Sequence, residues 1–195
     1  MTTRLSGRKT FFLPYNRDIE NPTVESGYST KYLWEEILHP DSILDIIENF
    51  VHLANEKEFY FNEKTQKIDT KKTEKLIFPR YHQLDLIKKF RNQIKEDGVG
   101  NNYLVQHTTG SGKSYSIGWL SHTLTSLYQK DGDTKRMFDS IIVVTDRKVL
   151  DDQLQTTIND LKQNKGVVYG VEKGSKDLKD FLESGKDIII STIQK

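Results

Sequence analysis

The chain has 195 residues, a length that suits one domain of ordinary size, or one domain with a small appendage. It contains 0 cysteines, which excludes a disulfide framework, a thiolate zinc site and a thiol nucleophile. With 29 basic and 28 acidic residues, its net charge of +1 excludes a basic field over the whole surface. No apolar run approaches the ~20 residues that span a bilayer, and no secretory signal is visible, so we expect a cytoplasmic protein with no membrane partner.

The first 75 residues predict short elements around a polar tract. Residues 1–27 are expected to be mostly irregular, with a short strand near 10–13. Ser29 or Thr30 is placed to cap a helix that ends at about Leu38, and a second helix opens at Pro40 and keeps helical spacing as far as Leu53. Alternating residues after that predict a small hairpin with its turn near 62–67, and the surrounding lysines indicate a solvated surface.

From residue 76 onward, helix-like and strand-like segments alternate. Helices are predicted at 81–96, 112–128, 149–161 and 177–182, and strands at 103–105, 141–144, 167–169 and 187–192. Strands that are apolar on both faces and separated by helices indicate a parallel sheet covered on both sides. We therefore predict an α/β fold, with a three-layer sandwich preceded by a helical segment and a small hairpin.

The strongest chemical signal is the stretch HTTGSGKS, residues 107–114, between a predicted strand and a predicted helix. Gly110 and Gly112 allow successive backbone N–H groups to face phosphate oxygens, and the start of the helix adds positive potential. Lys113 can reach the β and γ phosphates, and the hydroxyl of Ser114 suits magnesium. The strict pattern has glycine at position 107, where a histidine side chain is compatible with the loop. The predicted phosphate site consists of Thr109, Gly110, Ser111, Gly112, Lys113 and Ser114.

Further residues narrow the class of nucleotide protein. Gln83 lies upstream of the loop, and a glutamine amide can both donate to and accept from the edge of adenine. Thr145 and Arg147 follow one aliphatic strand, and Thr192 and Gln194 end another. Ligands bind at the carboxyl ends of strands in open α/β sheets, where such groups suit contacts with a sugar–phosphate backbone that do not read sequence.

Taken together, these stretches resemble the R (restriction, motor) subunit of type I restriction enzymes, a superfamily 2 helicase-like family. The quoted stretches are FFLPYN (11–16), YLWEEIL (32–38), IFPRYHQL (77–84), NYLVQH (102–107), GSGKS (110–114), FDSIIVVTDR (138–147) and STIQK (191–195). They extend over nearly the whole chain, and a histidine before the loop is expected in this family.

The resemblance implies a RecA-like first motor lobe over 76–195, incomplete at its C-terminus, after a linker and helical segment over 1–75. It implies an ATP-dependent type I site-specific deoxyribonuclease that couples translocation on double-stranded DNA to cleavage, with methyltransferase and specificity subunits as partners. It also implies that Gln83 contacts adenine, and that Lys113 and Ser114 handle the phosphates of ATP and Mg2+. The residues that it places near DNA are Thr145, Arg147, Thr192 and Gln194.

Two parts of the family's chemistry are not seen in the sequence. The nuclease centre needs a Glu-x-Lys pair, which does not occur, and the chain reaches Lys195 before an Asp-Glu pair completes the ATP site. We therefore expect the isolated chain to bind nucleotide weakly, and neither to hydrolyse ATP nor to cleave DNA.

Two other classes stay open. A phosphate-loop GTPase would show Asn-Lys-x-Asp, and the nearest string, at 164–167, lacks the aspartate. A phosphate-loop kinase would not need Gln83 or the Ser-Thr-Ile-Gln strand end. The third alternative is a non-catalytic binding or assembly module.

Overall fold

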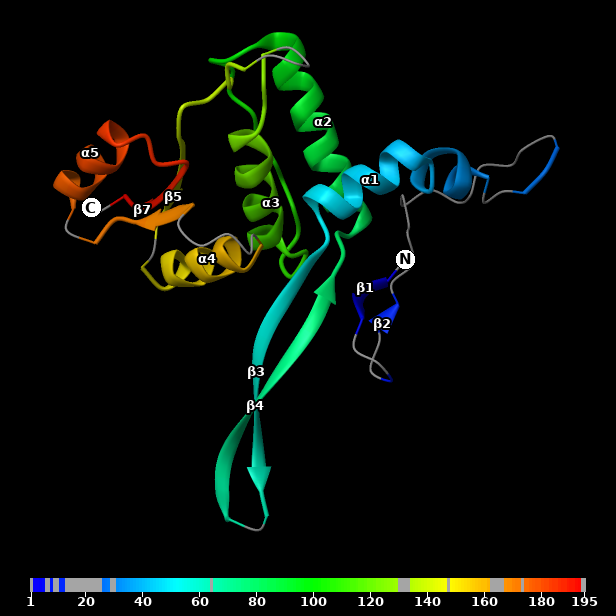
Figure 1. Ribbon diagram of the computed structural model, residues 1–195, viewed down its shortest axis with the longest axis vertical. Coiled ribbons are helices and arrows are strands. Elements are labelled where there is room, and N and C mark those ends of the chain that lie inside the picture. Colours follow the sequence, from blue (N-terminus) through cyan, green and yellow to red (C-terminus); the bar gives the residue numbers. More distant parts are fainter. Residues whose placement is uncertain are drawn as a thin grey trace. The chain divides into compact units, whose positions relative to one another are not determined.

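The computed structural model describes residues 2–5, 8, 11–12, 26–28, 31–63, 65–129, 134–146, 148–161, 167–172 and 174–193. The chain forms two compact units, Met1–His82 and Gln83–Lys195 (Figure 1).

The first unit contains a four-stranded antiparallel sheet in the order β2-β1-β4-β3. Its strands are β1 (Thr2–Leu5), β2 (Phe11–Phe12), β3 (His52–Asn62) and β4 (Lys67–Ile77). The last two pair along their whole length and form the long ribbon visible in Figure 1. The predicted hairpin and its turn are confirmed, with longer strands than expected. The predicted strand near 10–13 is β2, whereas β1 lies in a stretch expected to be irregular.

Two helical segments precede the ribbon: the π-helix η2 (Leu33–Ile37) and α1 (Pro40–Asn49). The predicted caps Ser29 and Thr30 lie outside the described residues. The prediction that the second helix continues to Leu53 is wrong, because the N–H groups of Phe50 and Val51 both donate to the carbonyl of Ile46 and β3 then begins. Here pairing with β4 overrides the helical spacing of apolar residues.

The second unit contains a parallel sheet in the order β5-β7-β6. Its strands are β5 (Ile141–Thr145), β6 (Val168–Gly170) and β7 (Ile188–Thr192). The central strand is buried throughout, and α4 (Lys148–Leu161) packs Leu154 and Ile158 against Ile188 and Ile190. The predicted mixed α/β fold with a parallel sheet is confirmed at this level.

The other helices here are α2 (Tyr81–Asp97), α3 (Lys113–Thr125) and α5 (Ser175–Glu183). With α4, they confirm the four predicted helices to within a few residues. The prediction that the strands are buried on both faces is confirmed for β7. It is wrong for β5, where Ile142 and Val144 are 46% and 58% exposed. None of the described helices is long and apolar enough to cross a membrane.

The strand predicted at 103–105 is wrong. The segment 101–108 forms no strand, and no described strand pairs with it. Leu104 is 94% exposed, whereas Tyr103 packs its ring against Phe90, with ring centroids 4.8 Å apart. A strand needs a neighbouring strand to satisfy its backbone groups, and strand propensity alone does not supply one.

Candidate functional site

The loop before α3 is shaped by two glycines in the left-handed region. Gly110 has φ +77° and Gly112 has φ +83°, conformations that glycine adopts at little steric cost. The N–H of Ser111 donates to the carbonyl of Thr108 at 3.3 Å, which closes the turn, and the N–H of Tyr115 donates to the carbonyl of Gly112. The N-cap residue, Gly112, has no side chain to cap the helix, so the N–H groups at the helix start can face an anion or water.

Lys113 and Ser114 form the first turn of this helix. Lys113 is exposed, and its ammonium group donates to the carbonyls of Thr108 at 3.0 Å and His107 at 3.5 Å. The cation therefore lies across the loop to which it belongs, held only by neutral acceptors among the contacts described. Ser114 is half-buried. The structure thus brings together the loop glycines, the lysine and the serine that the sequence predicts for phosphate binding.

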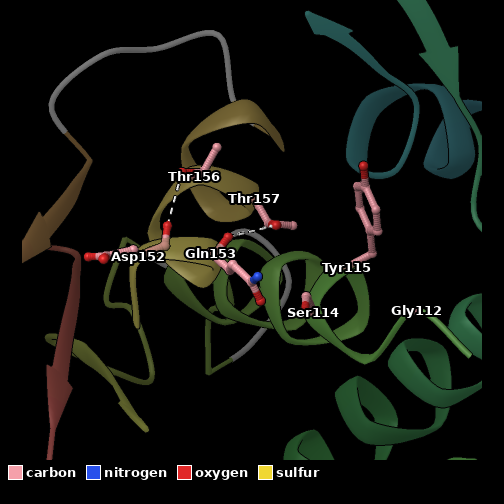
Figure 2. Close-up of a pocket in the computed structure, with 7 residues that line it drawn as sticks. All are labelled: Gly112, Ser114, Tyr115, Asp152, Gln153, Thr156 and Thr157. Atoms are coloured by element: carbon pink, nitrogen blue, oxygen red, sulfur yellow. Dashed lines mark hydrogen bonds between the residues drawn. The ribbon is translucent and has the colours of Figure 1, made fainter. Parts of the chain in front are cut away.

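A hollow of about 560 Å³ lies between the start of α3 and the middle of α4 (Figure 2). We call it the α3–α4 hollow, and it is lined by Gly112, Ser114, Tyr115, Asp152, Gln153, Thr156 and Thr157. The hydroxyl groups of the two threonines donate to backbone carbonyls one turn earlier in α4, each at 2.9 Å. The side chains of Asp152 and Gln153 are exposed. The hollow therefore offers a carboxylate and an amide opposite the serine.

The sequence did not predict that α4 residues line the site. Their spacing carried a signal, since Asp152, Gln153, Thr156 and Thr157 share one helical face, away from the buried Leu154 and Ile158. What the spacing could not show is that this face meets α3. The imidazole Nε2 of His122 lies 2.8 Å from the carbonyl oxygen of Ile158 and joins the two helices.

Gln83 reaches the loop from α2. Its side chain is 3% exposed, and Nε2 donates to the carbonyl of Gly112 at 3.0 Å and lies 3.5 Å from that of Ser111. A Cβ atom at Gly112 would lie 2.7 Å from the same Nε2. The positive φ therefore favours glycine here, and a Cβ atom would have to displace the Gln83 amide.

The two predicted strand-end threonines lie side by side at the carboxyl ends of their strands. Thr145 and Thr192 pair in register between β5 and β7, and the N–H of Ile193 donates to the carbonyl of Thr145 at 2.9 Å. Their side chains are 7% and 6% exposed, so both hydroxyl groups are nearly screened from solvent. Arg147 and Gln194 lie outside the described residues.

The described residues form no group of three or more His, Cys, Asp or Glu side chains able to hold a metal ion. The side-chain oxygens that line the α3–α4 hollow include the hydroxyl of Ser114 and, across from it, the carboxylate of Asp152. Magnesium is commonly held by one or two such oxygens together with water and substrate phosphates. The residues present therefore fit a magnesium ion that arrives with a phosphorylated ligand, and do not form a cage for a free ion.

Comparison with known proteins places this geometry in a family context. The family model for SWI2/SNF2 ATPases matches residues 82–195. The chain is 31% identical over 120 residues to the type I restriction enzyme SauCOLORF180P endonuclease subunit of Staphylococcus aureus strain COL, and 29% identical over 120 residues to the SsaAORF53P endonuclease subunit of Staphylococcus saprophyticus. These matches cover 62% of this chain but only 12% of each relative. They confirm the resemblance to type I restriction enzymes, and no solved structure matches the chain significantly.

Proposed function

Because this chain belongs to the SWI2/SNF2 ATPase family, we propose that it binds ATP with Mg2+ on the loop from Thr109 to Ser114. The observation that carries the proposal is the loop itself. It combines two glycines at positive φ, an exposed lysine that donates to two loop carbonyls, and a helix whose N-cap is a glycine with no capping side chain. Each of these features favours a bound polyphosphate, and all of them lie inside the segment that the family model matches.

The roles of Lys113 and Ser114 follow from their positions. An exposed ammonium group on a flexible stem complements the charge of the β and γ phosphates, and it can exchange its hydrogen bonds to two loop carbonyls for bonds to phosphate. The Ser114 hydroxyl, half-buried at the α3–α4 hollow, would hold Mg2+. When bound, the ion would neutralise part of the phosphate charge.

The same proposal includes a more specific fold for this part of the chain. A RecA-like three-layer sandwich over 76–195, as a first motor lobe, is supported by the parallel order β5-β7-β6, by the helices packed on this sheet and by the family match. Residues 1–75 are proposed to be the linker and helical segment that connects this lobe to a nuclease.

For the whole protein, we propose ATP-driven translocation on double-stranded DNA coupled to cleavage. The support is that the relatives are endonuclease subunits of type I restriction enzymes, which also favours methyltransferase and specificity subunits as partners. In this chain, the residues proposed to lie near the DNA backbone are Thr145, Arg147, Thr192 and Gln194. The burial of both threonine hydroxyls favours contact through neighbouring backbone groups.

Calorimetric titration of the 195-residue chain with Mg·ATP tests the nucleotide assignment. Loss of a charge-assisted contact with phosphate should weaken binding by Lys113→Ala about tenfold or more. Lys179→Ala is the matched control, because Lys179 is an exposed helical lysine paired with Glu183 on α5. Equal binding by the wild type and Lys113→Ala would contradict the proposal. Preference for GTP over ATP would favour the GTPase class instead.

A further inference from the structure

The long ribbon of β3 and β4 exposes a cluster of apolar side chains near its turn (Figure 1). Phe59, Phe61 and Ile68 are 72%, 57% and 70% exposed. Phe61 and Ile68 are paired residues in the register of the two strands, and Phe59 lies two residues before Phe61. Alternate residues of a strand share a face, so all three lie on one face, which we call the aromatic face. Exposed apolar side chains that gather in this way mark an interaction surface.

Among the described residues, no further strand flanks this part of the ribbon. β1 pairs with β4 only at Leu76 and Ile77, and β3 is the outermost strand of its sheet. At the base of the ribbon the buried residues Ala54 and Lys75 are paired, and they belong to the face opposite the aromatic one. The first unit therefore buries the opposite face. A two-stranded ribbon on its own is marginally stable in water, so a partner on the aromatic face would stabilise it.

Charged residues are divided unequally between the two faces of the ribbon. On the aromatic face, Lys72 is exposed, and the residue paired with it is a second lysine, Lys57. The acidic residues Glu58 and Asp69 occupy alternate positions, which belong to the opposite face. The first acidic residue on the aromatic face, Glu74, lies beyond the lysine pair, toward the base of the ribbon. Like charges at paired positions are destabilising unless something offsets them, so this face favours an anionic partner.

Double-stranded DNA offers both kinds of contact that the aromatic face can make. Its phosphates carry a dense negative charge that lysine neutralises. Two-stranded β-ribbons are narrow enough to enter its grooves. Phenylalanine and isoleucine side chains insert between base steps in proteins that bind and bend the duplex. A single docking could therefore satisfy Lys72 and the exposed rings of Phe59 and Phe61 together.

We propose that the aromatic face of the β3–β4 ribbon binds double-stranded DNA, with Lys72 against the phosphate backbone and the apolar cluster in a groove. This surface belongs to the first unit, whereas the strand-end residues that the proposed function assigns to DNA belong to the second. The inference goes beyond the proposed function, because the binding of ATP at the loop neither requires this surface nor excludes it.

The test is the fluorescence anisotropy of a labelled duplex of about 20 base pairs, two helical turns, titrated with the 195-residue chain. Lys72→Thr should weaken binding about fivefold and lower the slope of log affinity against log salt by about 1, because one phosphate contact is lost. The double variant Phe59→Thr, Phe61→Thr should weaken binding about tenfold and leave the salt slope unchanged, because apolar contacts release no counterions. Threonine is chosen because it suits a strand.

Two variants on the opposite face are the matched controls. Lys71→Thr removes an exposed lysine that neighbours Lys72 in the same strand. Tyr60→Thr removes a ring that lies between the two phenylalanines in sequence and is 49% exposed. Both controls should change the affinity much less than the variants of the aromatic face do.

Several results would overturn the inference. If Lys71→Thr and Lys72→Thr cause equal losses, binding depends on the overall charge of the ribbon and not on one face. If the corresponding single strand binds more tightly than the duplex, the occupant is not a groove of double-stranded DNA. A chain that does not bind the duplex at low salt, or whose variants all bind like the wild type, would also contradict the proposal.

Titration of the same variants with Mg·ATP keeps this result apart from the proposed function. The ribbon variants leave the phosphate loop unchanged, so each should bind Mg·ATP as the wild type does. If the chain binds the duplex as described but does not bind Mg·ATP, the proposed function fails and the inference stands. If it binds Mg·ATP but fails the duplex test, the inference fails alone.

Discussion

Substitution of the two loop glycines by alanine tests the geometry around Gln83. Both glycines have a positive φ, +77° for Gly110 and +83° for Gly112, so each alanine variant carries the same backbone strain. Their surroundings differ. A Cβ atom at Gly110 meets nothing within 4 Å, whereas one at Gly112 lies 2.7 Å from Nε2 of Gln83. Gly110→Ala is therefore the matched control for Gly112→Ala.

The expected free energies follow from these contacts. Left-handed backbone costs a residue with a Cβ about 1–2 kcal/mol, which is the whole cost expected for Gly110→Ala. Gly112→Ala must also push the buried Gln83 amide away from its carbonyls, and an unsatisfied buried donor costs about 1–3 kcal/mol more. Gly112→Ala should therefore lower the free energy of unfolding by about 2–5 kcal/mol.

Urea unfolding followed by the fluorescence of Trp119, which is 2% exposed in α3, measures both variants. A double-mutant cycle sharpens the comparison, because Gln83→Ala removes the atom that the new methyl group meets. In that background Gly112→Ala should cost only about 1–2 kcal/mol, like Gly110→Ala. Equal costs for the two glycines in the wild-type background, or strict additivity in the cycle, would refute the close approach of Gln83 to the loop.

Three further predictions concern packing and charge in the second unit. Gly118→Val should lower the free energy of unfolding by about 1–3 kcal/mol, because even a Cβ at this position meets Leu161 on α4; thermal unfolding measures the loss. Arg136→Met removes a 2.6 Å ion pair with Asp187, and because both side chains are more than a third exposed, urea unfolding should show a loss of only about 0.5–1 kcal/mol, which high salt abolishes. Burial raises the pKa of Asp160, so its ionised form opposes folding above that pKa. Asp160→Asn, near the C-terminus of α4, should therefore stabilise the chain by about 0.3 kcal/mol at about pH 7. The gain should be smaller at about pH 4, where the wild-type carboxyl group is partly protonated. A stabilisation that grows as the pH falls would contradict this sign.

Local signals in the sequence were enough for most elements of the second unit. The strand predicted at 141–144 and the helix predicted at 149–161 lie within a residue of β5 (Ile141–Thr145) and α4 (Lys148–Leu161). The strand predicted at 103–105 was wrong because strand formation depends on a pairing partner elsewhere in the chain. For the same reason the sequence could not reveal β1, whose register is set by β4.

For the candidate site, too, some parts were predictable from the sequence and others were not. The phosphate loop was predictable because the glycines, the lysine and the serine are neighbours in sequence, and their spacing fixes their geometry. The α3–α4 hollow was not, because its second wall depends on a tertiary contact, the hydrogen bond between His122 and the carbonyl of Ile158. The direction of the Gln83 amide likewise depends on how α2 meets the loop, which a motif does not encode.

The most direct test of the central claim is an NMR titration of the isotope-labelled chain with Mg·ATP. If this loop is the nucleotide site, the largest changes in backbone amide chemical shift should fall within residues 109–114, and Lys113→Ala should require much more ligand to produce them. Changes centred elsewhere, or no change in the loop at saturating ligand, would contradict the account.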